Sequence, residues 1–238
     1  MTISINRIKA ILIKELKDLK SNTNCLVMIL LPIMFSVIYG QIITGMPKIQ
    51  ALILPILMAI ILIGPFIPSM LIAEEKEKNT LRVLMLSPAK APEVMIGKGL
   101  LSLILLIIES ILCVIIPGCS FGNILIFLSA ILLMSIFMII LGMTVGLVSP
   151  DSKATGVIGF PIYIIFFIPI VFIGVKNELL DKFAHLIPTF HLGEILNKNM
   201  NSKSFGVMQN DFLNMIIWLV LAIILFVVVY KKKSLEDN

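Results

Sequence analysis

The sequence predicts an all-helical membrane protein. We expect six transmembrane helices, an interfacial amphipathic helix before the first, and a re-entrant outer hairpin between the fifth and sixth. Three observations support this class: 59% of the 238 residues are hydrophobic, only 14% are charged, and the mean hydropathy is +1.09. A soluble domain has roughly a quarter of its residues charged, so an aqueous surface is excluded for most of the chain.

The apolar stretches each approach the length of a membrane span. A helix needs about 20 apolar residues to cross a hydrocarbon core of about 30 Å, and lipid offers the backbone no other hydrogen-bond partner. Prolines in the second and fifth stretches predict kinks. We predict one transmembrane domain over residues 25–230, with spans at 25–45, 51–73, 99–117, 124–148, 157–175 and 212–230.

Residues 1–24 predict a cytoplasmic interfacial helix. Apolar residues recur there at three- and four-residue steps while the lysines fall elsewhere, which is typical of an amphipathic helix over residues 3–20. A basic helix beside a span lies in the membrane interface. The apolar positions are Ile5, Ile8, Leu12, Leu16 and Leu19.

Lysine and arginine residues predict the orientation of the spans, because they concentrate in cytoplasmic segments. We count five before span 1, five between spans 2 and 3, one between spans 4 and 5, and three in the basic tail at 231–238, against five on the opposite side. We therefore expect a multi-pass protein of the cell membrane with both termini in the cytoplasm. The basic residues are explained by the orientation of the protein in the membrane, and no nucleic-acid partner is expected.

The outer segment at 176–211 contains the run HLIPTFHLGEIL, which is apolar and partly helical in pattern but is interrupted by Pro188 and Gly193. It is too short to span, so a re-entrant or surface-lying hairpin fits. His185 and His191 lie in this segment. Two histidines are fewer than the three or four ligands of a zinc site, so we expect solvated side chains and no metal.

The segment between spans 2 and 3 carries the functional signal. It begins with a charged run at 74–78, and Asn79 can then cap a short helix at 80–86 before Pro88. That helix has apolar side chains with nothing in its own loop to bury them, which indicates a protein partner. These side chains are Leu81, Leu84 and Met85.

This segment resembles the signature of ABC-2-type permeases. The residues that carry the resemblance are Ala73, Glu75, Lys76, Glu77, Asn79, Thr80, Leu81, Arg82, Leu84, Met85, Ser87, Pro88, Gly97 and Lys98. Asn79 replaces the usual glycine and Arg82 replaces a common glutamate. The second departure changes the charge offered to a partner and leaves its identity open.

The resemblance implies that the 74–90 loop is a coupling helix that docks on a separate ABC ATPase, through Glu75 to Met85 of the signature. No G-x-x-x-x-G-K-[ST] phosphate-binding loop occurs in the chain. ATP and Mg²⁺ therefore belong to the partner, and this chain is not expected to be an enzyme. Such permeases work in pairs, which implies a homodimer or a close heterodimer.

Glu109 falls inside span 3, where a carboxylate is costly. It predicts either a contact in the translocation path or a structural hydrogen bond between helices. Two other functions compete with transport by an ATP-driven exporter. An intramembrane protease could use Glu74 and Glu75 with the histidines, but these groups lie on opposite sides of the membrane, out of reach of each other. A secondary transporter is disfavoured, since no inverted repeat is visible.

The composition bears on the cargo. Phe and Met number fourteen each, against three Tyr and one Trp, which favours a flexible lining for amphipathic or hydrophobic cargo. The short chain also resembles permeases of amphipathic-peptide exporters, such as that for phenol-soluble modulins. Lipid or drug export is the alternative.

Overall fold

The computed structural model describes residues 4–20, 22–43, 45, 47–78, 91–171 and 182–236, and these residues form helices joined by turns, without a β-strand among them. Among these described residues, six stretches of helix are long and apolar enough to cross a membrane. They are α2 (Thr23–Val37) with its π-helical continuation η1 (Ile38–Ile42), α3 (Lys48–Glu77), α5 (Ala91–Ile115), α6 (Ile124–Val148), α7 (Ser152–Val171) and α10 (Gln209–Glu236). The shorter elements are α1 (Ile5–Leu19), α9 (Pro188–Met200) and the 3-10 turn η2 (Phe205–Met208). The predicted class, all-helical with six spans, is confirmed.

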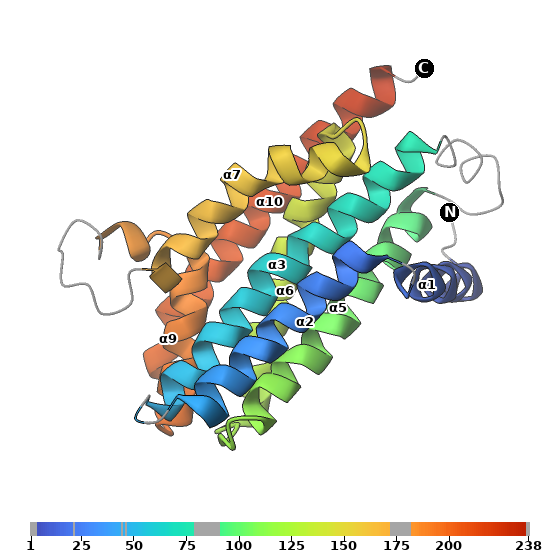
Figure 1. The fold of residues 1–238 in the computed structure, drawn as a ribbon. Coiled ribbons are helices and arrows are strands. Elements are labelled where there is room, and N and C mark those ends of the chain that lie inside the picture. The colour runs from blue at the N-terminus through green and yellow to red at the C-terminus, as the bar shows by residue number, and fades with distance from the viewer. Residues whose placement is uncertain are drawn as a thin grey trace.

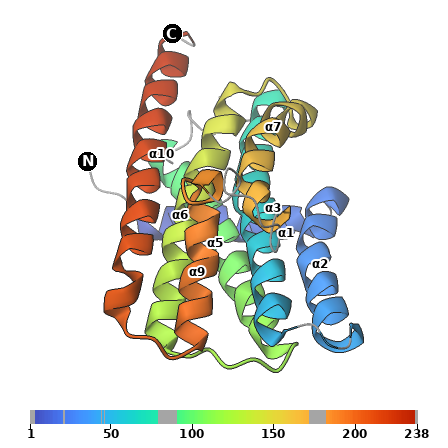
Figure 2. The same ribbon diagram turned by 90° about the vertical axis from the view of Figure 1, so that its left-hand side faces the viewer.

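The long helices run side by side, while α1 lies across one end of the bundle (Figures 1 and 2). The helix at the centre is α3, which packs on α2, α5, α6, α7 and α9. In an 18-residue apolar stretch of α3, 72% of the residues are buried, against 17% in the corresponding stretch of α2 and 11% in that of α10. The peripheral helices α2 and α10 therefore present most of their apolar surface outward.

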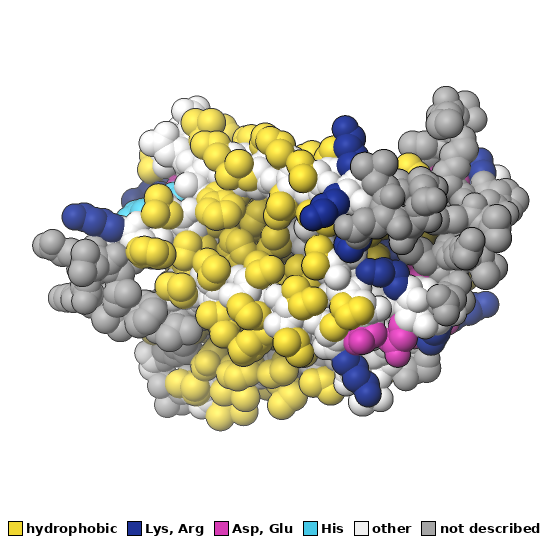
Figure 3. All heavy atoms as spheres, turned by 90° about the horizontal axis from the view of Figure 1, so that it is seen from above, with side chains coloured by type: hydrophobic (Ala, Val, Ile, Leu, Met, Phe, Trp, Pro, Cys, Tyr) yellow, Lys and Arg dark blue, Asp and Glu magenta, His cyan; other side chains and the backbone are white. Residues whose placement is uncertain are grey.

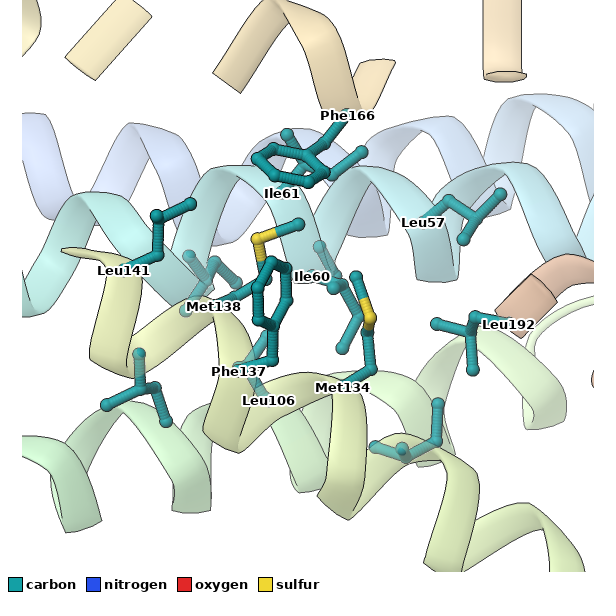
Figure 4. Packing of buried hydrophobic residues seen from close by; sticks show 14 of the residues in the cluster. Leu57, Ile60, Ile61, Leu106, Met134, Phe137, Met138, Leu141, Phe166 and Leu192 are labelled. Atoms are coloured by element: carbon teal, nitrogen blue, oxygen red, sulfur yellow. The ribbon is translucent and has the colours of Figure 1, made fainter. Parts of the chain in front are cut away.

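The core lies mainly between α3 and α6. Ile60 and Ile61 of α3 meet Phe137 and Met138 of α6, and Phe166 of α7 covers them from the side (Figure 4). The Phe137 and Phe166 rings pack edge to face, with centroids 5.4 Å apart. Such aromatic pairs stabilise by about 1 kcal/mol beyond the area that they bury.

Two glycines bring α6 and α3 into close contact. A Cβ atom at Gly142 would lie 2.1 Å from the Pro65 carbonyl oxygen, and one at Gly146 would lie 2.7 Å from that of Ser69. Any larger side chain at Gly142 would therefore push the two helices apart.

Hydrophobic side chains form a broad band over the surface, and the charged side chains gather toward its two ends (Figure 3). This is the distribution that a bilayer-spanning protein requires, because charge at the bilayer centre is costly.

Several element boundaries differ from the sequence prediction, among them the start of the third span, since α5 begins at Ala91 and not at residue 99. The second span was expected to end at residue 73, with the charged run in a loop, but α3 continues to Glu77. The basic tail at 231–238 is helical as far as Glu236, because α10 continues through it. Prolines lie inside α3 and α7, and each helix continues through them.

The predicted outer hairpin contains α9, which packs on α10, α6, α3 and α7. Residues 172–181 lie outside the described part of the chain. The re-entrant character of this hairpin remains a prediction.

Candidate functional site: the charged end of α3

Four charged side chains from three helices meet where α1 crosses the bundle. We call them the basal ion cluster: Lys14 and Glu15 of α1, Glu75 of α3 and Lys98 of α5. Glu15 and Lys98 are each only 1% exposed. Buried charges are tolerated only when they are paired and hydrogen-bonded, so the cluster joins the three helices through an obligatory set of contacts.

Lys98 is at the centre of the cluster. Its ammonium donates to Glu15 Oε1 at 2.8 Å and to the Leu71 carbonyl at 3.1 Å, and it lies 3.0 Å from Glu75 Oε1. An ammonium has three N–H donors, and each therefore has an acceptor. The sequence predicts that Lys98 is a loop lysine flanking span 3; it is instead buried within α5.

Lys14 supplies the second positive charge of the basal ion cluster and pairs with both of its carboxylates. Its Nζ lies 3.0 Å from Glu75 Oε1 and 3.3 Å from Glu15 Oε1, so the cluster holds two positive and two negative groups. Partial burial lowers the pKa of Lys14, but the charge of Glu15 and the hydrogen bond to Glu75 outweigh it and set that pKa above its ordinary value. Lys14 therefore stays charged across the physiological range.

Gly97 allows α1 to reach the cluster. A Cβ atom at this position would lie 2.6 Å from Ile11 Cγ2, so α1 crosses α5 directly over the glycine. The row of α1 that becomes buried is Ile11, Glu15 and Leu19, whereas Ile5 of the predicted apolar face is 80% exposed. This explains the Gly-Lys pair of the signature. Gly97 lets α1 cross closely over α5, and Lys98 forms the ion pairs with Glu15 and Glu75.

A further contact fixes the beginning of α1. Glu93, in the first turn of α5, is fully buried and accepts from the Ser4 backbone N–H at 2.8 Å. Arg7 lies 3.4 Å from the same carboxylate oxygen.

Lys76 ties α3 to the end of α6. Its ammonium donates to the carbonyl oxygens of Leu147 at 2.8 Å and Ser149 at 2.6 Å. The last carbonyls of a helix have no partner within the helix and carry partial negative charge, so a lysine there is favourable.

Glu77 ties α3 to the beginning of α7. Its Oε2 accepts from the Ser152 backbone N–H at 3.1 Å and from the Ser152 hydroxyl at 2.9 Å. A carboxylate at a helix N-terminus satisfies a free N–H and complements the helix dipole. Consecutive residues of the signature therefore reach different neighbours: Glu75 reaches α1 and α5, Lys76 reaches α6, and Glu77 reaches α7.

The rest of the predicted coupling segment lies in residues 79–90, which the structure does not describe. This applies to Asn79, Thr80, Leu81, Arg82, Leu84 and Met85.

Glu109 lies within α5 and is 2% exposed. The carboxylate is turned into the bundle, as expected for a charge-bearing group in a span. Neither of its oxygens has a hydrogen-bond partner among the described residues. Whether it contacts cargo remains a prediction.

A second ion cluster lies at the opposite end of the bundle and holds α9 to the start of α10. We call it the outer ion cluster: His191, Glu194, Lys198 and Asp211. His191 Nδ1 is 2.7 Å from Asp211 Oδ1 and Nε2 is 2.8 Å from the His185 carbonyl. The expectation that His191 is solvated is wrong, because this side chain is buried against Asp211.

Lys198 completes the outer ion cluster, with Nζ 2.8 Å from Asp211 Oδ2. Burial lowers the pKa of Lys198, but the hydrogen bond and charge of Asp211, supported by Glu194, raise it above its ordinary value. Among the residues that the structure describes, no group of three or more His, Cys, Asp or Glu side chains could hold a metal ion.

The fold defines a multi-pass helical membrane protein whose charged end is tied together by the last turn of α3. The ABC-2 family transporter protein domain matches residues 44–231. The chain therefore belongs to the ABC-2 transporter family, as the signature indicated, and is a membrane permease of that family. A comparison with curated proteins found no match.

Proposed function

We propose that this permease is an exporter subunit driven by a separate ABC ATPase, and that the last turn of α3 couples the two. The observation that carries this proposal is the position of Glu75, Lys76 and Glu77. They immediately precede the 79–90 segment, and their side chains contact α1, α5, α6 and α7.

The coupling follows from these contacts. An ATPase that moves the 80–86 segment would pull on the last turn of α3. Because that turn is joined to four other helices by charged hydrogen bonds, its movement would carry their ends with it. Charge-assisted hydrogen bonds are short and directional, so they transmit displacement better than apolar contacts, which can slide.

The test is co-purification of an ATPase with the permease. Leu84→Asp would bury a charge at the docking surface, at a cost of about 2–5 kcal/mol, and should abolish co-purification while membrane insertion persists. Ala89→Asp is the matched control, since it adds the same charge to the same segment outside the signature. Retention of the ATPase by Leu84→Asp, or ATP hydrolysis by the purified permease alone, would contradict the proposal.

For the cargo we favour an amphipathic peptide, with lipid or drug export as the alternative. The support is the Phe- and Met-rich composition, which suits a flexible apolar lining. Transport of an amphipathic helical peptide into inside-out vesicles, compared with that of an apolar dye, separates the two. Permeases of this kind act as pairs, and we propose a homodimer or a close heterodimer.

The protease alternative gains no support from the geometry. Glu75 belongs to the basal ion cluster beside α1, and His191 belongs to the outer ion cluster beside α9, at the other end of the bundle (Figure 1). Groups so separated cannot share a reacting water.

A further inference from the structure

An apolar groove opens on the surface between α5, α6 and α10. Its volume is about 500 Å³, and its lining is apolar apart from the tip of Tyr230. The residues that define its ends are Pro92 and Leu103 of α5, Ile136 and Met143 of α6, and Ile223 and Tyr230 of α10. This groove is separate from both ion clusters.

The packing of α10 explains why the groove exists. This helix packs mainly on α6 and α9 and stands at the edge of the bundle (Figure 2). Gly99 keeps α5 close to α6, since a Cβ atom there would lie 2.8 Å from Met143 Cε. α6 therefore forms the floor, α5 forms one wall, and the stacked rings of Phe226 and Tyr230, 6.0 Å apart, form the other.

The length of the groove matches one leaflet of a bilayer. From Pro92 to Leu103 there are eleven helical steps, which rise about 16 Å. Half of a hydrocarbon core of about 30 Å is about 15 Å. The groove begins at the charged end of the bundle and ends near the middle of the membrane.

Positive charge stands at the charged end of the groove. Tyr230 lines the groove, and Lys231, Lys232 and Lys233 follow it directly on the same continuous helix. The side chains of Lys231 and Lys232 are exposed. Lysines beside the cytoplasmic leaflet attract anionic headgroups.

We propose that the groove binds an acyl chain of an anionic glycerophospholipid of the cytoplasmic leaflet, and that the exposed Lys231 and Lys232 at its charged end attract the phosphate. An apolar groove of leaflet length fits an acyl chain, and the lysines fit the phosphate. The proposal is independent of the ATPase.

The test uses the purified full-length permease in detergent, with brominated phospholipids as quenchers of tryptophan fluorescence. The chain has one tryptophan, so Trp218→Phe removes the background. Phe226→Trp then places a groove reporter on α10. Val228→Trp provides the matched outer reporter, because position 228 lies on the same helix half a turn away and is 60% exposed.

Brominated phosphatidylglycerol should quench the groove reporter at a lower concentration than brominated phosphatidylcholine, by roughly fivefold for each contributing lysine. Lys231→Gln with Lys232→Gln should remove this preference. Lys9→Gln with Lys17→Gln, which removes the same charge from α1, should retain it. The outer reporter should show no preference in any background.

Equal quenching of the groove reporter by both lipids would overturn the proposal, as would a preference that survives the loss of Lys231 and Lys232. If neither lipid quenches the groove reporter, but both do so once the protein is diluted, a second copy of the chain covers the groove and the proposal is wrong.

Discussion

Lys98 and Glu15 are the residues on which the charged end of the bundle depends. They lie 83 positions apart in the chain, and their charges are hidden from solvent. A buried ion pair is worth little compared with a well-packed apolar pair, but the removal of one partner leaves an uncompensated charge. Without the Lys98 ammonium, Glu15 and Glu75 would share Lys14 alone, and one negative charge of the cluster would be uncompensated.

We therefore expect Lys98→Met to lower the free energy of unfolding by about 3–5 kcal/mol. The measurement is thermal or denaturant unfolding of the purified protein in detergent. Lys17→Met is the control, since it removes a lysine from the exposed side of α1 and should change stability by less than about 0.5 kcal/mol. A full double-mutant cycle with Glu15→Gln should show strong coupling; additive effects would argue against the pair.

His191 leads to a second prediction. Both ring nitrogens face acceptors, a carboxylate at Nδ1 and a carbonyl at Nε2. A neutral imidazole has one N–H and can satisfy only one of them, whereas the imidazolium satisfies both. The contact of α9 with Asp211 therefore depends on the Asp211 carboxylate, and its removal should loosen α9.

Hydrogen exchange of the α9 amides measures this effect. Asp211→Asn should speed their exchange. His185→Gln should not, because His185 contributes only its backbone carbonyl to His191. Unchanged exchange in Asp211→Asn would contradict the assignment.

Among the elements, the last turn of α3 departs most from its sequence interpretation. The charged run at 74–78 suggested a solvated loop, because neighbouring charges are usually hydrated. In the structure Glu75, Lys76 and Glu77 continue the helix, since each has a partner on another element. The sequence could predict that this run matters, but its partners come from distant segments with no local signal.

The position of α1 has the same explanation. Periodicity predicted an amphipathic helix at 3–20, and α1 occupies Ile5–Leu19. The pattern could not predict that Glu15 would be buried, because its burial depends on Lys98, which lies 83 positions away in the chain. The spans were predictable, because length and hydropathy determine which segments cross a bilayer.

The crossing of α1 over α5 leads to a prediction about Gly97. Gly97→Val should displace α1 and separate Glu15 from Lys98, because the new side chain would overlap Ile11. Proteolysis of the N-terminal segment should become faster. Gly156→Val on α7 is the control, since a Cβ atom there would have no other atom within 4 Å, and it should leave α1 protected. Equal protection in both variants would show that α1 is held elsewhere.

Across the whole molecule, the two ion clusters lie at opposite ends of an apolar bundle. The charge asymmetry predicts that the end with α1 and both termini faces the cytoplasm. We expect an impermeant thiol reagent to label Asn201→Cys from outside sealed cells, but not Ile5→Cys or Glu236→Cys. The background must lack Cys25, Cys113 and Cys119. Labelling of either terminal position from outside would refute the orientation.

The proposed transmission of ATPase movement through the last turn of α3 to the other helices can be measured as a distance. Spin labels at position 201 on the two copies of the proposed dimer, with the proposed ATPase partner bound, report the separation of their outer ends before and after ATP is trapped.

We predict that ATP changes this distance in the otherwise unaltered permease. In the Lys76→Met, Glu77→Gln variant the change should be lost although the ATPase still co-purifies, because the apolar side chains expected to dock, Leu81, Leu84 and Met85, are unchanged. An unchanged ATP-driven movement in that variant would contradict coupling through the last turn of α3.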